Sequence, residues 1–207
     1  MIAITPSIGK NQLVKGIKIE SHIYSTMFGN LLILLSLAAV TTAQFAPVVD
    51  LDLTMYMGRW YQVYKNRFDM AFQGDGTCAV ADYSLVNSNV TVLNSQIDKD
   101  GSLDQINGYA FYKPNSSGGE LTVRLDGVPQ PAPYWVLELG PIVNKQYDYA
   151  IVSGNNPISL FVLCRNVNRY YELYNDQVQE NLLKYGFTNA LNKPLVMYQN
   201  DCDYTKY

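Results

Sequence analysis

The chain has 207 residues, and its 15 Lys and Arg against 18 Asp and Glu give a net charge of −3. A mildly acidic chain without a basic patch is a poor candidate for nucleic-acid binding. The single histidine is His22, which lies in a segment predicted to be removed, so His-based catalytic triads, general bases and metal ligands are excluded from the mature domain.

The N-terminal part of the chain has the features of a targeting sequence. Residues 31–40 (LLILLSLAAV) form an apolar run far shorter than the roughly 20 residues that span a bilayer. Residues 41–43 (TTA), followed by Gln44, fit a small-residue cleavage site. We predict a signal peptide with an upstream segment over residues 1–43, with Met27 as an alternative start and an uncleaved N-terminal anchor as the alternative interpretation.

Cleavage there leaves residues 44–207, a length that suits one domain with a sizeable core. Three lysines and Glu20 leave with the removed segment, so 12 Lys and Arg remain against 17 Asp and Glu, and the net charge becomes −5. An exported chain favours disulfides. The cysteines are Cys78, Cys164 and Cys202, which allow one pair and one leftover thiol.

From Gly58 onward the sequence reads as short strands separated by turn signals, starting with the apolar-rich run 60–64. Period-two alternation and turn residues predict further strands at residues 79–85, 90–97, 105–112, 121–125, 134–139, 147–153 and 158–165. Between the first two predicted strands, residues 68–76 form a long loop that holds apolar side chains. Most connections have hairpin length, which predicts an antiparallel meander in a sandwich or an up-and-down barrel.

The periodicity changes only after Arg165. Between residues 170 and 185, Leu173, Val178, Leu182 and Leu183 recur at roughly helical spacing, and Gly186 follows as a stop signal. This pattern predicts one amphipathic helix that packs against the outside of the sheet. Residues 194–198 are predicted as a short final strand.

These segments carry motifs that resemble the lipocalin family, in its apolipoprotein D-like branch. The G-x-W motif and an arginine at the end of the last barrel strand match two family signatures, whereas Y-D-Y departs from the usual Thr-Asp-Tyr at its first residue. The signature residues are Gly58, Trp60, Asp148, Tyr149 and Arg165, and the branch-level matches are residues 76–85 (GTCAVADYSL), 92–94 (VLN) and 132–137 (APYWVL). The resemblance covers residues 49–202.

The resemblance implies an all-β fold: an eight-stranded antiparallel up-and-down β-barrel of the lipocalin, or calycin, type. It implies one open end, a hydrophobic cup and a C-terminal α-helix packed on the outside. It also implies that Trp60 and Arg165 stack across the closed end, a cation–π contact worth roughly 1–2 kcal/mol with a structural role.

The resemblance further implies a disulfide between Cys78 and Cys202, which would contribute on the order of 4–5 kcal/mol. Cys164 is then left over. If Phe161 faces inward, alternation turns Cys164 outward beneath the helix. Either it is a buried inert thiol, or it forms an intermolecular disulfide in a covalent dimer, so both a monomer and a dimer stay open.

Trp60, near the start of the first strand, marks the closed end of such a barrel. The N-glycan sequons at Asn89 and Asn115 then also lie at the closed end and leave the mouth free. The mouth consists of the loop with Phe68, Met70 and Phe72 together with residues 98–101, 128–131 and 154–157. Its apolar residues either act as a lid, touch a lipid surface or pack on one another.

Alternation also assigns a ligand-binding lining. Because Glu138 is expected to point outward, Trp135 and Leu137 are expected to point inward. The full predicted set is Tyr83, Leu85, Leu121, Val123, Leu125, Trp135, Leu137, Tyr149, Ile151 and Phe161. This lining suits an elongated or flat apolar ligand with one or two polar groups. No cation has a confident inward parity, so steroids, retinoids, neutral lipids or odorants fit as well as a fatty acid.

The function predicted first is a secreted, extracellular carrier that buries a small hydrophobic ligand in the barrel, with no cofactor and no metal. An enzyme is disfavoured because the inward positions hold no expected cysteine and the mature domain has no histidine. The alternative is an antioxidant, lipid-protective or receptor-directed signalling role. In that role, mouth-loop or surface residues contact a lipid surface or a receptor.

Overall fold

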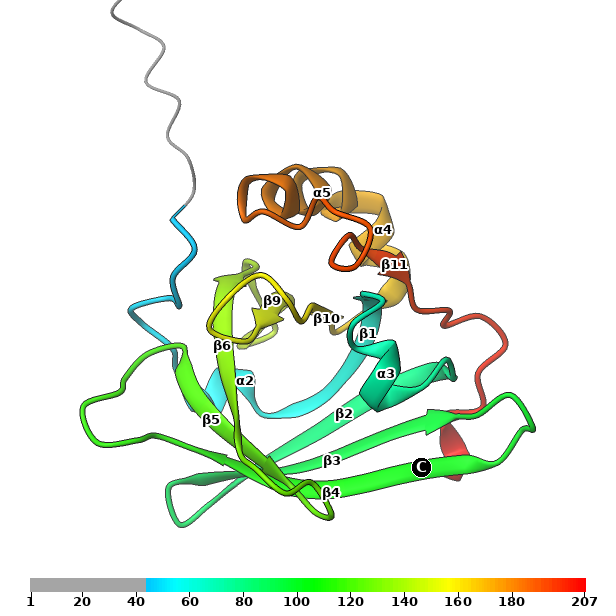
Figure 1. Ribbon diagram of the computed structural model, residues 1–207, viewed down its shortest axis with the longest axis horizontal. Helices are drawn as coiled ribbons and strands as arrows, with labels where there is room; N and C mark the ends of the chain where they lie inside the picture. Colours follow the sequence, from blue (N-terminus) through cyan, green and yellow to red (C-terminus); the bar gives the residue numbers. More distant parts are fainter. Residues whose placement is uncertain (1–43) are drawn as a thin grey trace, which may run out of the picture. The chain divides into compact units, whose positions relative to one another are not determined.

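The computed structural model describes residues 44–207 (Figure 1). The predicted signal peptide and upstream segment, together with His22, lie outside the described residues. Within residues 44–207, no helix is long and apolar enough to cross a membrane.

Eight strands form one antiparallel sheet that closes on itself. In chain order they are β1 Gly58–Lys65, β2 Thr77–Val86, β3 Asn89–Ile97, β4 Leu103–Phe111, β5 Glu120–Leu125, β6 Ala132–Leu139, β9 Tyr149–Ser153 and β10 Phe161–Cys164. Each strand pairs with the next one in this order, and β10 pairs back with β1. The predicted up-and-down barrel is confirmed, and the sandwich alternative is wrong.

Short elements join and flank these strands. They are α2 Leu53–Tyr56, α3 Met70–Gln73, the hairpin of β7 Ile142–Val143 with β8 Gln146–Tyr147, β11 Leu195–Val196 and the 3₁₀ turn η1 Tyr204–Lys206. The α3 helix lies inside the predicted long apolar loop. Strand β11 pairs with the end of β1, beside the place where β10 joins it. The predicted strand 147–153 is divided, because Tyr147 belongs to β8 and the barrel strand begins at Tyr149.

The predicted C-terminal helix is two consecutive helices, α4 Val167–Leu173 and α5 Asn175–Lys184. The helix begins earlier than predicted because the side chain of Asn166 caps it, accepting a 2.9 Å hydrogen bond from the backbone N–H of Arg169. Tyr174 separates the two helices, with φ −121° and ψ −21° outside the regular helical range. Gly186 follows α5 with φ +89°, a conformation that a residue without Cβ adopts readily.

Two hydrophobic clusters lie on opposite sides of the barrel wall. The inner cluster fills the barrel and includes Trp60, Ala81, Tyr83, Val90, Val92, Ala110, Leu121, Val136, Val152 and Leu163. The outer cluster lies between the wall and helices α4 and α5 and includes Val63, Leu137, Tyr149, Ile151, Val162, Cys164, Tyr170, Val178 and Leu182. Of the four residues predicted for the helical stripe, Val178 and Leu182 are buried, whereas Leu173 and Leu183 are exposed.

A β-bulge interrupts β6 and decides which side chains enter the barrel. Val136 pairs with Val152 and Glu138 pairs with Ile151, so Leu137 is an extra residue with no partner of its own. Leu137 and Glu138 therefore both face the helix side: Leu137 lies in the outer cluster, and Glu138 accepts hydrogen bonds from the Asn181 side chain.

The disulfide between Cys78 and Cys202 is present and joins the start of β2 to the C-terminal tail. Cys164 is the free thiol, and it is fully buried in the outer cluster, on the outward side as alternation predicts. Burial raises the pKa of the Cys164 thiol well above its ordinary value. The covalent dimer stays a prediction, and an intermolecular bond through Cys164 requires local opening of the helix side.

Candidate functional site

The floor of the barrel is a stacked pair, Trp60 and Arg165. The guanidinium carbon of Arg165 lies 3.5 Å from the centroid of the Trp60 ring, the stacking that the resemblance implies. The indole N–H of Trp60 donates to the carbonyl of Tyr56 at 2.8 Å, so its buried polar group has a partner. Burial lowers the pKa of Arg165 to about 10, so the guanidinium stays charged at neutral pH.

Arg165 also connects the segment before β1 to the floor. It donates to the carbonyls of Met55, Tyr56 and Met57 through Nη2, to Arg59 through Nη1 and to Tyr147 through Nε. A planar fork with five N–H groups matches this ring of carbonyls, which the three donors of a lysine cannot do.

We expect Arg165→Lys to lower the free energy of unfolding by roughly 2–3 kcal/mol, because buried carbonyls lose their donors while the charge is kept. Denaturant unfolding of the purified domain measures this change. Arg124→Lys at an exposed position is the matched control and is expected to change stability by less than about 0.5 kcal/mol. Equal stabilities of the two variants would contradict the role given to the fork.

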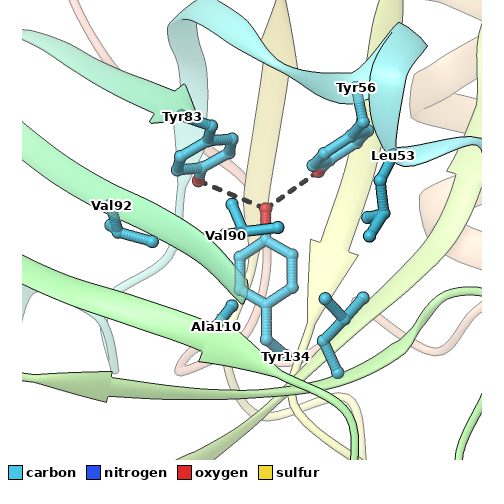
Figure 2. A pocket seen from close by; sticks show the side chains of 8 residues that line it. Leu53, Tyr56, Tyr83, Val90, Val92, Ala110 and Tyr134 are labelled. Atoms are coloured by element: carbon cyan, nitrogen blue, oxygen red, sulfur yellow. Dashed lines mark hydrogen bonds between the residues drawn. The ribbon is translucent and has the colours of Figure 1, made fainter. Parts of the chain in front are cut away.

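Above the floor, three tyrosines from separate elements meet inside the barrel (Figure 2). The hydroxyl of Tyr134 lies 2.8 Å from that of Tyr56 and 3.2 Å from that of Tyr83. Burial raises the pKa of Tyr83 to about 12 and raises those of Tyr56 and Tyr134 as well. The group is therefore a neutral, hydrogen-bonded polar spot in an apolar chamber.

The chamber around these tyrosines holds a cavity of about 10 Å³. Such a volume is about enough for one water molecule. Figure 2 shows how the side chains converge, and the lining residues are Leu53, Tyr56, Tyr83, Val90, Val92, Ala110, Leu121 and Tyr134. The side chains that define the chamber thus fill most of the space that a larger ligand would need.

Five of the predicted lining residues belong to this interior. Tyr83 and Leu121 line the cavity, and Val123, Leu125 and Phe161 pack against the inner cluster. Their role in ligand binding stays a prediction, but the structure brings them together on the inner face.

The inward placement predicted for Trp135, Leu137, Tyr149 and Ile151 is wrong, because all four lie in or against the outer cluster under the helices. For Trp135 and Leu137 the prediction counted backward from an outward Glu138, and the bulge at Leu137 shifts that count by one residue. In β9 the inward residues are Ala150 and Val152 instead.

Leu85 is also not part of the chamber, since 42% of it is exposed. Gly58, the first residue of β1, pairs with Tyr83, so β2 continues past the start of its neighbour. Beyond that point β2 pairs only with β3, and no further wall covers the inward side of Leu85.

Several chamber residues were missed from the sequence. Val90 and Val92 alternate with the exposed Thr91, a signal that period-two counting could have used. Tyr134 was missed because of the bulge. Leu53 and Tyr56 precede the first strand, where no periodicity points to an interior position.

The open half of the barrel contains a polar layer formed by Gln62 and Lys65 of β1 and Gln96 of β3, all at most 5% exposed. Alternation from Trp60 places Gln62 on the inner face, and alternation from Val92 does the same for Gln96. The layer is not fully satisfied within residues 44–207, because Oε1 of Gln96 is buried without a hydrogen-bond partner.

The segment that carries α3 covers this layer, and we call residues 68–76 the α3 segment. In Figure 1 α3 lies between the end of β1 and the start of β2. The Gln73 side chain exchanges hydrogen bonds with Gln62, and the Gln73 carbonyl accepts from Gln96 at 2.6 Å. The ammonium of Lys65 donates to the carbonyls of Gly74 and Gly76 at 3.0 and 3.4 Å.

Asp69 connects the start of the α3 segment to the opposite loop. Its Oδ2 accepts from the backbone N–H of Leu160 at 2.8 Å and from that of Asn66 at 3.2 Å. Asn66 in turn donates to the carbonyl of Ile158. Burial raises the pKa of Asp69 to about 7, against the opposing effect of these hydrogen bonds and of Lys65.

The connections at the two ends follow the barrel topology. Asn89 and Asn115 are both exposed at the closed end, and their glycosylation stays a prediction.

The signature residue Asp148 is buried and forms an ion pair with Arg169 of α4, in which both carboxylate oxygens accept hydrogen bonds from the guanidinium. This pair fixes the helix to the barrel wall. In residues 44–207 no group of His, Cys, Asp or Glu side chains could hold a metal ion.

The family model described as a lipocalin-like domain matches residues 51–194, which span all eight barrel strands. The chain belongs to the lipocalin family. Apolipoprotein D of Rattus norvegicus is 38% identical over 42% of this chain and 46% of its own length. The Lazarillo protein of Schistocerca americana is 34% identical over 50% of this chain and 46% of its own length. These relatives support membership in the apolipoprotein D-like branch, although this lipocalin spans about half the length of the curated relatives it matches.

Solved structures agree with the fold. Lobster apocrustacyanin A1 superposes with a TM-score of 0.56 at 20% identity, covering 74% of this chain and 83% of that one. At this identity the likeness shows the lipocalin fold and no more.

Proposed function

We propose that this lipocalin binds a small hydrophobic molecule inside its barrel and carries it outside the cell. The observation that carries the proposal is the apolar chamber between the Trp60 floor and the polar layer, with the three tyrosine hydroxyls as its polar spot. Apolar walls with a few placed polar groups are typical of ligand pockets. The disulfide and the predicted signal peptide over residues 1–43 support an extracellular location.

Binding follows from desolvation, at about 25 cal/mol per Å² of apolar surface removed from water, offset by the lost freedom of the ligand. A cavity of about 10 Å³ does not admit a lipid-sized molecule. The ligand must therefore displace interior side chains or the α3 segment. No catalysis is part of the proposal, since the inner cluster contains no cysteine or histidine.

The chain's two tryptophans permit a direct test, because Trp60 lies on the barrel floor and Trp135 on the helix side. In a Trp135→Phe background, a polyene alcohol such as retinol is expected to quench the fluorescence of Trp60 saturably. Adding Val92→Phe should weaken this binding at least tenfold, because the larger ring occupies the chamber.

Val196→Phe is the matched control, since Val196 lies on β11 and is exposed. It should leave retinol affinity unchanged. Absence of saturable quenching, or equal affinity in the Val92→Phe and Val196→Phe variants, would overturn the proposal of an interior site.

A second candidate function, lipid-protective or receptor-directed action at the surface, rests on the mouth. Phe72 is 78% exposed and its ring lies 5.2 Å from that of Phe68, so an aromatic pair faces outward next to the opening. Exposed apolar groups of this kind suit a lipid surface. Loss of phosphatidylcholine vesicle binding in a Phe68→Ser, Phe72→Ser variant with unchanged retinol affinity would favour this function.

A further inference from the structure

We propose that residues 103–107 of strand β4 are a docking surface for an extended peptide segment that carries a lysine or an arginine. We call these residues the β4 edge. The partner segment adds one more strand to the sheet and places its basic side chain beside Asp104. The proposal is independent of what the barrel carries, because no residue of the β4 edge lines the interior cavity.

The wall between β4 and β5 is incomplete toward the open end of the barrel. β4 pairs with β3 over residues 103–110, but it pairs with β5 only over residues 108–111. The last contact on that side is the hydrogen bond from the N–H of Asp126 to the carbonyl of Asn107, at 2.9 Å. In Figure 1 the right-hand part of β4 lies at the lower rim of the sheet, with β3 above it and no strand below it.

Alternation decides which backbone groups of the β4 edge point away from β3. The carbonyl of Asn107 points toward β5, since it accepts from Asp126. Every second residue of a strand points its backbone groups to the same side, so the N–H and C=O of Gln105 and Leu103 point that way too. Within residues 44–207 no hydrogen bond to these groups is found, and four of the five edge residues are exposed. The edge is therefore open to another strand.

A row of unpaired N–H and C=O groups is a template for strand addition. Many proteins oppose such pairing with a proline or a lysine on the edge strand, and residues 103–107 contain neither. In strand addition the main-chain hydrogen bonds supply affinity, and alternate side chains supply specificity. The exposed side chain of Leu103 offers an apolar neighbour to a side chain on the outer face of the partner.

The charges around the β4 edge favour a basic partner. Four carboxylates lie on the edge or next to its ends, and they belong to Asp98, Asp100, Asp104 and Asp126. None of the four takes part in an ion pair within residues 44–207, and the one lysine of the turn, Lys99, is paired with another carboxylate. An opposite charge directly across from Asp104 stabilises strand pairing, whereas a like charge destabilises it.

The same geometry disfavours a second copy of this chain as the partner. In antiparallel pairing, residues whose backbone groups face the edge lie opposite one another. Asp126 already lies opposite Asn107, so two copies can use both residues 103 and 105 only when Leu103 lies opposite Gln105 of the other copy. That register places the two Asp104 carboxylates directly opposite each other, which is destabilising. Asp104 thus opposes self-pairing and favours a basic strand from another protein.

In the proposed complex, a Val-Lys-Val segment pairs antiparallel with residues 103–105. The backbone groups of its first valine bond to Gln105, and those of its second valine bond to Leu103. The lysine then lies opposite Asp104, in a non-hydrogen-bonded pair whose Cα atoms are about 4.5 Å apart. At this spacing the ammonium reaches the carboxylate, so the four main-chain hydrogen bonds and the ion pair form together.

An NMR titration of ¹⁵N-labelled protein with the peptide acetyl-Thr-Val-Lys-Val-Thr-amide, at low ionic strength, tests the proposal. The largest shift changes are expected at the amides of Leu103 and Gln105, and hydrogen exchange of these amides should slow on binding. The matched peptide with glutamate in place of lysine should bind about tenfold more weakly, because the attraction at Asp104 becomes a repulsion. Asp104→Lys should reverse this order of affinities.

Two further variants separate the backbone from the charge. Gln105→Pro removes an edge-facing N–H and leaves the pairing with β3 intact, so it should abolish binding of the lysine peptide without changing the far-UV circular dichroism. Asp50→Lys makes the same charge change as Asp104→Lys at an exposed position away from β4, and it should keep the original order of affinities.

Equal binding of the two peptides, an order that Asp104→Lys leaves unchanged, or no binding at millimolar peptide would overturn the proposal. Sedimentation of the protein without peptide tests the other occupant. A concentration-dependent dimer that Gln105→Pro dissociates would assign the β4 edge to a second copy of this chain and would also overturn the proposal.

Discussion

Replacing Cys78 and Cys202 together by alanine is expected to lower the free energy of unfolding by about 5 kcal/mol. The bridge closes a loop with a sequence separation of 124 residues, and the chain-entropy relation gives about this value for a loop of that length. Such a loss is a large fraction of the 5–15 kcal/mol that typically separates folded from unfolded domains. The variant should therefore be close to unfolding at 37 °C.

The effect is expected to act mainly on the unfolded chain. In the folded state the tail has other ties: the Met197 N–H donates to the carbonyl of Val63, and the Gln199 side chain donates to the carbonyls of Gln62 and Ala79. The tail should thus remain docked without the bridge, and ligand affinity should change little. Guanidinium unfolding curves and retinol titrations measure the two quantities separately.

Reduction supplies the control for this prediction. A reducing agent should lower the stability of the unsubstituted protein to that of the double variant and leave the double variant unchanged. A double variant within about 1 kcal/mol of the unsubstituted protein would show that the loop-closure argument fails here.

The second large effect is a pH dependence centred on Asp69. Its pKa in the folded protein is about 7, against 3.8 for an ordinary Asp, because burial disfavours the carboxylate. A group whose pKa is raised on folding contributes its stability at low pH and loses it as the pH rises through the folded value. At about 1.4 kcal/mol per pKa unit, the difference corresponds to a loss on the order of 4 kcal/mol.

Asp69→Asn removes the titration and keeps a side-chain oxygen that can accept from Leu160 and Asn66. We expect this variant to gain stability relative to the unsubstituted protein as the pH is raised from about 4 to about 8. Urea unfolding at several pH values measures the difference, and Asp126→Asn, at an exposed position, serves as the control. A difference that stays constant across this range would contradict the raised pKa.

Strand order and barrel closure were accessible to sequence reasoning. The alternation of Leu121, Val123 and Leu125 with polar neighbours holds in the structure because β5 is regular, so that these three residues face the inner cluster. Trp60, Arg165 and the Cys78–Cys202 pair were found through the family resemblance. Each of these positions needs a group that one residue type supplies: the indole ring of Trp60, the guanidinium of Arg165 and the two thiols that form the disulfide.

The candidate site was decided largely by tertiary structure. One extra residue at Leu137 reversed the side-chain directions in β6, and no local pattern signals a bulge whose cause lies in the pairing with β9. The polar layer was missed for a related reason. A second register shift in β1, between Gln62 and Tyr64, breaks the alternation that would have placed Lys65.

By itself, the sequence of this protein determined the class of fold, the order of its strands and the residues that lock its floor and its tail. Only the tertiary structure decided which side chains meet inside the barrel. The hydroxyls of Tyr56, Tyr83 and Tyr134, and the donors Gln62, Lys65 and Gln96, come from strands and loops far apart in the chain. Local periodicity predicts which side chains of one strand share a face. A binding site depends in addition on the register between several strands, which decides which of these side chains meet.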